Sequence, residues 1–217
     1  MTYIIAIDGP SGSGKSTISN KLAGILNIEY LNTGSMYRAT TLYFLENGLD
    51  ENSTDNQVLE ALDEVNINFI DNKIYLNEKN VEDRIRTDSI TKNVSWVAAN
   101  GLVRKRLVDM QRQIADEKSF VLDGRDIGTV VFPNAKYKFY LTANARQRAI
   151  RRFDQHESGL TIDEIEKAII ARDQYDSTRK ISPLKKADDA IEIDNSNLNI
   201  DQTIALILEN MDKEDVL

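Results

Sequence analysis

A glycine-rich segment near the start of the chain limits the folds that the whole sequence can adopt. Residues 9–16 read Gly-Pro-Ser-Gly-Ser-Gly-Lys-Ser and match the pattern G-x-x-x-x-G-K-[ST] at every position. The segment follows a short apolar run at residues 3–7, and after it apolar side chains recur at helical spacing over residues 16–26. A strand, a glycine-rich loop and a helix in this order predict a buried parallel sheet whose first loop surrounds an anion.

The residue types in this loop are those that bind a nucleoside triphosphate. Glycines let successive backbone N–H groups turn inward around a phosphate, and the following helix adds the positive end of its dipole. Lys15 is expected to reach the β- and γ-phosphates, while the Ser16 hydroxyl is expected to hold Mg²⁺, the predicted cofactor. The loop alone leaves the acceptor of the phosphoryl group open. The predicted ATP-binding residues are Gly9, Pro10, Ser11, Gly12, Ser13, Gly14, Lys15, Ser16 and Thr17.

The rest of the chain alternates between strand-like and helical patterns. Short apolar runs predict further buried strands at residues 120–122, 137–141 and 190–193. Helical spacing extends from about residue 90 to 115, and we expect Asn100-Gly101 to break that helix. Alternating strands and helices predict an α/β fold, a parallel sheet covered by helices on both faces.

The pattern changes between about residues 52 and 86. A helical stretch is followed there by two short strands, 66–70 and 73–76, which flank Asp71-Asn72 and predict a hairpin. A hairpin inside an otherwise alternating chain is interpreted as an inserted subdomain on the substrate side.

The composition excludes several classes of function. The formal net charge is −8, which opposes binding to nucleic acid or to an anionic membrane surface. There is no cysteine, which fits a reducing compartment, and the only histidine, His156, is expected to be a solvated residue. Because the chain runs from Met1 directly into an apolar strand, we expect no leader and a cytoplasmic location. Nucleotides are the expected partners, and the chain is expected to be a monomer.

Several further segments match those of bacterial cytidylate kinases, in the same order along nearly the whole chain. They are Asp8-Gly9-Pro10, Thr33–Arg38, Asp123–Pro133, Arg172-Asp173 with Asp176 and Arg179, Ser182-Pro183-Leu184, and Ala187–Ala190. The chain therefore resembles this family of nucleoside monophosphate kinases. The resemblance implies a P-loop nucleoside monophosphate kinase fold in a single domain, residues 1–217. Its parts would be a core at about 1–51 and 87–217, a monophosphate-side insertion at about 52–86, and a short lid at about 148–160.

The same resemblance implies a binding site for CMP or dCMP. Arg38 and Arg125 would hold the monophosphate. The cytosine edge would be faced by Thr33, Arg104, Asp126 and Arg179, and the sugar by Ser95, Arg172 and Asp176. Asp123 joins this substrate-binding set, although its place at a strand end also suits it to orient a water on Mg²⁺. Lys15, Arg125 and Arg179 are the expected catalytic residues.

Spacing alone leaves some of these roles open. Arg172, Asp176 and Arg179 are spaced i, i+4 and i+7, so on a helix they share one face. Spacing alone favours a solvated, salt-bridged surface, and the surrounding family match favours a ligand site instead. Ser95 and Arg104 are nine residues apart and would lie on opposite faces of one continuous helix. They can serve one ligand only if the helix breaks at Asn100-Gly101, where the family usually has a proline at position 101.

A basic cluster follows the strand at residues 137–141 and consists of Arg146, Arg148, Arg151 and Arg152. It could be a solvated helix face, or it could be a kinase lid whose arginines spread the charge of the transferred phosphoryl group. We favour the lid.

The predicted reaction is the Mg²⁺-dependent transfer of a phosphoryl group from ATP to CMP or dCMP. A nucleoside monophosphate attacks through an oxygen that is already ionised, so a chain with a single histidine needs no general base. The alternatives are a kinase for another small acceptor, such as UMP or AMP, and a nucleotide-binding switch without turnover.

Overall fold

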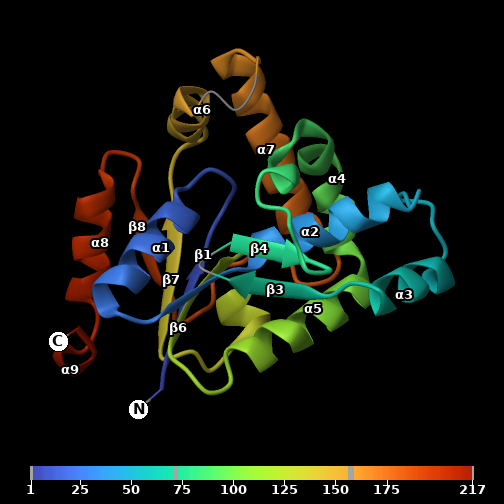
Figure 1. The fold of residues 1–217 in the computed structure, drawn as a ribbon. Helices are drawn as coiled ribbons and strands as arrows, with labels where there is room; N and C mark the ends of the chain where they lie inside the picture. Colours follow the sequence, from blue (N-terminus) through green and yellow to red (C-terminus); the bar gives the residue numbers. More distant parts are fainter. Residues whose placement is uncertain (1, 71–72, 156–158, 217) are drawn as a thin grey trace. The chain divides into compact units, whose positions relative to one another are not determined.

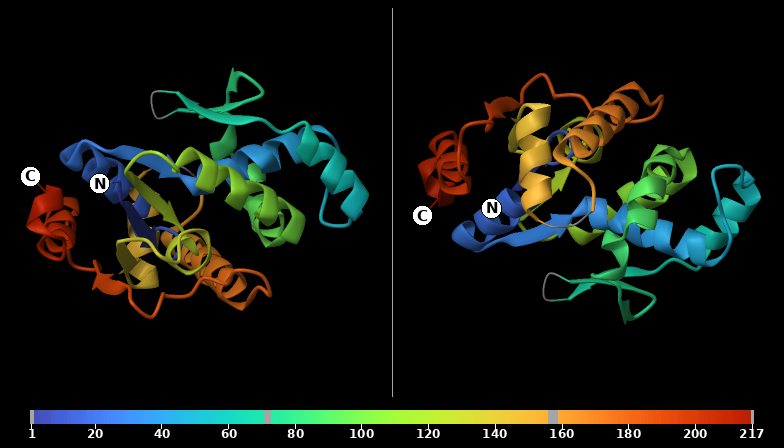
Figure 2. Two further views of the ribbon diagram at one scale, coloured as in Figure 1. Left: turned by 90° about the horizontal axis from the view of Figure 1, so that it is seen from below. Right: turned by 90° about the horizontal axis from the view of Figure 1, so that it is seen from above.

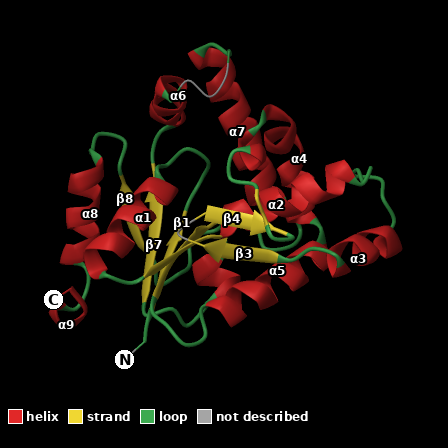
Figure 3. Ribbon diagram, viewed as in Figure 1, coloured by secondary structure: helices red, strands yellow, loops and turns green. Residues whose placement is uncertain are grey.

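The computed structural model describes residues 2–70, 73–155 and 159–216 (Figure 1). By its internal contacts the chain divides into two compact units. One unit consists of Met1–Leu31 and Ala115–Leu217, and the other is the continuous segment Asn32–Ile114. Helices and strands alternate along most of the chain (Figure 3), as the sequence pattern predicts.

The first unit is built on a five-stranded sheet with the order β2-β6-β1-β7-β8. β1 pairs with β6 and with β7 in parallel, and β7 pairs with β8 in parallel. The predicted α/β fold with a parallel sheet is confirmed. The strands span Ile4–Asp8 (β1), Glu29–Asn32 (β2), Phe120–Gly124 (β6), Tyr137–Thr142 (β7) and Ile191–Asp194 (β8).

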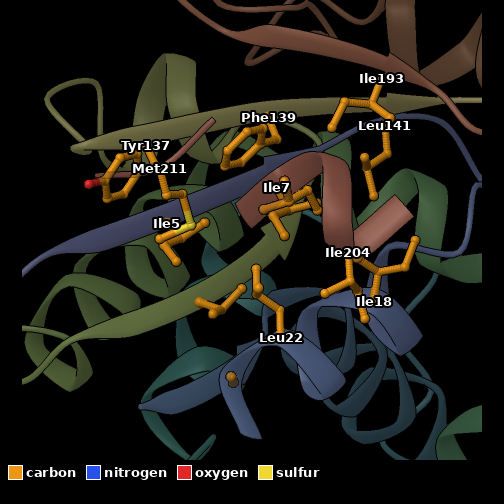
Figure 4. Close-up of a cluster of buried hydrophobic side chains, with 13 residues drawn as sticks. Ile5, Ile7, Ile18, Leu22, Tyr137, Phe139, Leu141, Ile193, Ile204 and Met211 are labelled. Atoms are coloured by element: carbon orange, nitrogen blue, oxygen red, sulfur yellow. The ribbon is translucent and has the colours of Figure 1, made fainter. Parts of the chain in front are cut away.

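Helices α1 and α8 of this unit pack against each other (Figure 2) and share one apolar core with the strands. Each large side chain removed from water there contributes roughly 1.5–3 kcal/mol. Figure 4 shows this core, which includes Ile5, Ile7, Ile18, Leu22, Phe139, Leu141, Ile193 and Ile204. The helices span Lys15–Leu26 (α1), Ala145–Asp154 (α6), Ile162–Thr178 (α7), Ile200–Glu209 (α8) and Lys213–Val216 (α9), and a π-helical turn covers Ile127–Val131.

Helices α6 and α7 also pack against each other, through a small cluster of Ala149, Ile165 and Ile169. α7 begins after Thr161, whose hydroxyl oxygen accepts a hydrogen bond from the Glu164 N–H. The Glu164 carboxylate in turn accepts from the Thr161 N–H at 2.8 Å, which completes a capping box.

The second unit combines helices with a small antiparallel sheet of order β3-β4-β5. The predicted hairpin is confirmed, because β3 (Ile67–Ile70) pairs with β4 (Lys73–Leu76) in antiparallel register. β5 (Lys79–Asn80) was not predicted, since two polar residues show no alternation. The other elements are α2 (Thr33–Glu46), α3 (Asp55–Asp63), a 3₁₀ turn (Arg84–Arg86), α4 (Asp88–Ala99) and α5 (Gly101–Ile114).

The predicted helix break at Asn100-Gly101 is confirmed. Asn100 has φ −71° and ψ 125°, which is extended backbone and ends α4. Its side-chain oxygen accepts from the Leu102 N–H at 2.9 Å and so caps the start of α5. A capping asparagine therefore turns the chain here, and Gly101 is the first residue of α5.

The predicted insertion, residues 52–86, lies wholly within the unit Asn32–Ile114 together with α2, α4 and α5. The division into core, insertion and lid stays a prediction. Part of the predicted lid, residues 156–158 with His156, lies outside the described residues, as does Asp71-Asn72. Within the described ranges, the helices are all too short or too polar to span a membrane.

Candidate functional site

The glycine-rich loop joins β1 to α1 and needs glycine at particular positions. Gly14, just before α1, has φ 86°, in the left-handed region that favours glycine. A Cβ atom on Gly9 would lie 2.0 Å from the backbone oxygen of Leu141 in β7. The motif is therefore required by the fold as well as by the chemistry of anion binding.

Lys15 lies inside this loop and is buried. Its ammonium group donates to the Pro10 carbonyl at 2.6 Å and to the Ser13 hydroxyl at 3.3 Å. Burial lowers the pKa of Lys15 well below that of a free lysine, Arg125 adds to this effect, and Asp123 opposes it. An anion bound close to Lys15 would therefore stabilise the protonated form of its side chain.

Asp123 lies near the carboxyl end of β6 and links the strand to the loop helix. Its Oδ2 atom accepts from the Ser16 hydroxyl at 2.9 Å, and its Oδ1 atom accepts from the Tyr30 hydroxyl at 2.7 Å. Burial raises the pKa of Asp123, and Lys15 is the largest opposing influence. A hydroxyl and a carboxylate at the end of a parallel strand are the oxygen ligands that suit Mg²⁺.

Within the described residues there is no group of three or more acidic or histidine side chains that could hold a metal ion by itself. Mg²⁺ commonly takes only one or two protein ligands and fills its shell with waters and substrate phosphates. Ser16 and Asp123 therefore fit a metal that arrives with a nucleotide.

Asp8, at the carboxyl end of β1, fixes the segment that follows Asp126. Its two carboxylate oxygens accept from the N–H groups of Ile127 and Gly128, both at 2.8 Å. Burial raises the pKa of Asp8 to about 7, although both hydrogen bonds act in the opposite direction. Sequence reasoning gave Asp8 no role, and the available indication was a carboxylate closing an apolar strand.

Four of the predicted acceptor residues lie together in the first unit. Asp176 of α7 accepts from Arg125 Nε at 2.9 Å and lies 4.0 Å from Arg179 Nη1. Arg179 Nη2 also lies 3.8 Å from Asp126 Oδ1. Arg125, Asp176, Arg179 and Asp126 thus alternate in charge along one network that is buried or half-buried. Arg172 lies one helical turn before Asp176 on α7.

The shared helical face that the spacing of Arg172, Asp176 and Arg179 would give does not include Arg179, because α7 ends at Thr178. Arg179 has φ −62° and ψ 144°, which is extended, and its Nε donates to the Ser182 carbonyl at 2.6 Å. Leaving the helix lets the side chain approach both Asp126 and Asp176.

Arg172 of α7 and Asp123 of β6 also lie in the first unit, whereas the other predicted acceptor residues lie in the second. Arg38 of α2 donates to the Ile85 carbonyl at 3.0 Å and to the Thr91 hydroxyl at 3.1 Å. Thr33 is buried at the start of α2, and Ser95 is half-buried on α4.

Arg104 of α5 is buried, and the break before the helix lets it reach back to the Ala98 carbonyl at 3.1 Å. Its guanidinium carbon lies 5.4 Å from the centre of the Tyr37 ring, a cation–π geometry. Sequence reasoning missed Tyr37, which lies inside a quoted segment but was given no role.

The basic cluster of the predicted lid is engaged in three ways. Arg148 is buried and bonded to the glycine-rich loop, and Arg151 bonds to Asn195, which follows β8. Arg146 forms ion pairs with Asp163 and Glu166 of α7 on the protein surface. The arginines of α6 therefore differ in their partners, a distinction that the sequence did not reveal.

The family model described as cytidylate kinase matches residues 5–213 of the chain. The chain belongs to the cytidylate kinase family. A cytidylate kinase of Fusobacterium nucleatum is 48% identical over 213 residues, which cover 97% of this chain and 97% of that protein. A cytidylate kinase of Acholeplasma laidlawii is 46% identical over 211 residues, with 95% and 94% coverage.

Among solved structures, an uncharacterized protein from Eubacterium ventriosum matches with a TM-score of 0.55 and 16% identity. It covers 98% of this chain and 99% of that one, and the likeness shows the shared fold alone. The sequence relatives carry the functional conclusion instead. As a member of the cytidylate kinase family along nearly its whole length, the chain is an enzyme.

Proposed function

We propose that the chain transfers the γ-phosphoryl group of ATP to CMP, and also to dCMP, giving ADP and the corresponding diphosphate. The observation that carries this proposal is the loop around Lys15, with Ser16 bonded to Asp123, in a chain of the cytidylate kinase family. Nucleotides are the proposed partners, and a cytoplasmic monomer is the proposed form.

On the donor side, the loop residues 9–17 bind the triphosphate of ATP. Lys15 neutralises charge on the β- and γ-phosphates, and Ser16 with Asp123 provides ligands for Mg²⁺ or for its waters. Mg²⁺ held there would supply positive charge that neutralises the phosphates. Residues of this kind act by positioning and by electrostatic stabilisation rather than by proton transfer.

On the acceptor side, Arg38 and Arg125 bind the monophosphate, since a guanidinium grips a phosphate at two points. The hydrogen bond that Arg125 Nε donates to Asp176 holds the guanidinium in one orientation and supports its assignment. The sugar is assigned to Ser95, Arg172 and Asp176.

The cytosine edge is assigned to Thr33, Arg104, Asp126 and Arg179. Cytosine presents an amine that donates and two acceptors, so its reader needs both a carboxylate and a guanidinium. The proximity of Arg179 Nη2 to Asp126 Oδ1, 3.8 Å, supplies both groups at one place.

A coupled assay of ADP release across CMP, dCMP, UMP, AMP and GMP tests the proposal. We expect rapid turnover with CMP and dCMP and at least about tenfold lower kcat/KM with the other three. Preference for UMP or AMP would contradict the acceptor assignment. ATP binding without turnover of any acceptor would instead identify a nucleotide switch.

A further inference from the structure

The glycine-rich loop is held from outside by side chains that lie far from it in the sequence. The Ser11 N–H donates to Asp173 Oδ1 at 3.0 Å, and the Ser11 carbonyl accepts from Arg148 Nη1 at 2.8 Å. Arg148 and Asp173 also pair with each other at 2.5 Å. The Ser13 carbonyl accepts from Asn195 Nδ2 at 2.9 Å.

These bonds fix the direction of individual peptide groups. In a trans peptide, the carbonyl of one residue and the N–H of the next point in opposite directions. Because Arg148 holds the Ser11 carbonyl, the N–H of Gly12 points away from Arg148. In the same way, Asn195 holds the Ser13 carbonyl and directs the N–H of Gly14 away from itself.

The peptide between Pro10 and Ser11 is held at both ends. Lys15 Nζ binds the Pro10 carbonyl at 2.6 Å, whereas Asp173 binds the Ser11 N–H on the other side. This N–H is therefore committed to a carboxylate and faces away from Lys15. The backbone N–H groups of the loop therefore point in different directions, and residues outside the motif determine the direction of each.

The Arg148–Asp173 pair is largely buried, unlike an ion pair on the protein surface. The Arg148 side chain is 7% exposed and that of Asp173 is 19% exposed. Arg148 Nε also donates to the Ala143 carbonyl at 2.8 Å. A Cβ atom on Gly12 would lie 3.3 Å from the Arg148 Cβ, so α6 packs closely on the loop.

Asn195 has its own support. The residue is 2% exposed, and its side-chain oxygen accepts from Arg151 Nη1 at 3.0 Å. Its N–H donates to the Thr142 carbonyl at 2.8 Å, which fixes it against the end of β7. Arg151 therefore orients the side-chain amide of Asn195 so that its Nδ2 group donates to the Ser13 carbonyl.

We propose that Arg148, Asp173 and Asn195 are positioning residues that orient the peptide groups of the loop for the triphosphate of ATP. The proposal rests on the proposed function, since it concerns the ATP side of that reaction. Arg148, an arginine of the predicted lid, would then act by orienting the loop and would not contact the transferred phosphoryl group. α6 and α7 are thereby coupled to nucleotide binding.

The test compares three α7 variants: Asp173→Ala, Asp173→Asn and, as a matched control, Glu166→Ala. Glu166 also pairs with an arginine of α6, Arg146 at 3.0 Å, but it is not among the partners of the loop in the described part of the chain. Three measurements are made: the Kd of a fluorescent ATP analogue with the KM values for ATP and CMP, hydrogen exchange of a peptide covering residues 11–14, and thermal unfolding.

For Asp173→Ala we expect the Kd and KM for ATP to rise about tenfold, because Ser11 loses its acceptor and Arg148 is left buried without its counter-charge. The KM for CMP should stay within about twofold, and the loop peptide should exchange faster. Asp173→Asn keeps an acceptor for Ser11 and should show a smaller rise, about threefold. A merely structural role would lower the unfolding temperature without separating ATP from CMP.

The proposal is overturned if ATP affinity and loop exchange change no more than in Glu166→Ala. If Asp173→Ala does not fold, Asp173→Asn and Asn195→Ala decide by the same two measurements. The Kd for ATP is measured without turnover. The test of the loop therefore gives a result even if the proposed acceptor is wrong.

Discussion

Replacing Asp8 with asparagine is expected to remove a pH dependence of stability that comes from one buried carboxyl group. Asp8 is 4% exposed, and its carboxylate accepts hydrogen bonds from the backbone N–H groups of Ile127 and Gly128. Despite these bonds, burial raises its pKa from 3.8 to about 7. Asparagine has nearly the same shape but stays neutral at every pH, so the variant isolates the titration.

The sign follows from proton linkage. Because the pKa of Asp8 is higher in the folded chain, the folded state binds more protons than the unfolded state between about pH 4 and pH 7. The contribution to stability is fully present below the unfolded pKa and is lost as the pH rises through about 7. The whole shift corresponds to about 4 kcal/mol, of which roughly 2–3 kcal/mol falls between pH 5 and pH 8.

Urea unfolding of wild type and Asp8→Asn at pH 5, 6, 7 and 8 measures this contribution. The difference in unfolding free energy, wild type minus variant, should fall by roughly 2–3 kcal/mol across that range. Taking the difference cancels the other titrating groups. Asp201→Asn, which removes a largely exposed carboxylate paired with Lys21, controls for the loss of one acidic group. A difference that stays constant within about 0.5 kcal/mol would refute the reasoning.

Three further variants test the proposed site. Lys15→Ala should lower kcat at least about a hundredfold while the fold survives, as turnover and circular dichroism will show; near-normal turnover would disprove the loop assignment. Arg125→Met should raise the KM for CMP at least about tenfold with little effect on that for ATP, whereas equal damage to both would indicate a structural role. Asp126→Asn should narrow the CMP/UMP ratio of kcat/KM about fivefold or more by impairing CMP use, since one such contact is worth about 1–3 kcal/mol; an unchanged ratio would remove Asp126 from the base-reading group.

Local patterns predicted most of the fold. The run before the glycine-rich loop became β1, the predicted hairpin strands paired as β3 and β4, and Asn100 broke the helix as its position suggested. Each of these depends on residues within a few positions of one another, where spacing and turn chemistry decide the structure. β5 was missed because two residues carry too little pattern.

The contacts that shape the candidate site could not be predicted in this way. Ser11 and Asp173 are separated by 162 positions, and Ser13 and Asn195 by 182. Their meeting depends on which strands are neighbours in the sheet and on how α6 and α7 pack. In the sequence, Asp173 appears only within a segment that resembles the family and Asn195 has no role, so only the fold reveals what they hold.

The charges around Lys15 suit the polyanion that is proposed as the ligand of this site. Burial disfavours the ammonium group, and the pKa of Lys15 is lowered as a result. The nearby carboxylates Asp123 and Asp8 compensate only in part, because the effect of burial on Lys15 is larger than their attraction. A bound triphosphate carries negative charge that is independent of these two groups, and its oxygens can replace the Pro10 carbonyl and the Ser13 hydroxyl as acceptors. Exchanging neutral acceptors for ionised ones strengthens each hydrogen bond to the ammonium group. The energetic cost of burying Lys15 is thus recovered when the nucleotide binds, which makes phosphate binding and full protonation of Lys15 mutually reinforcing.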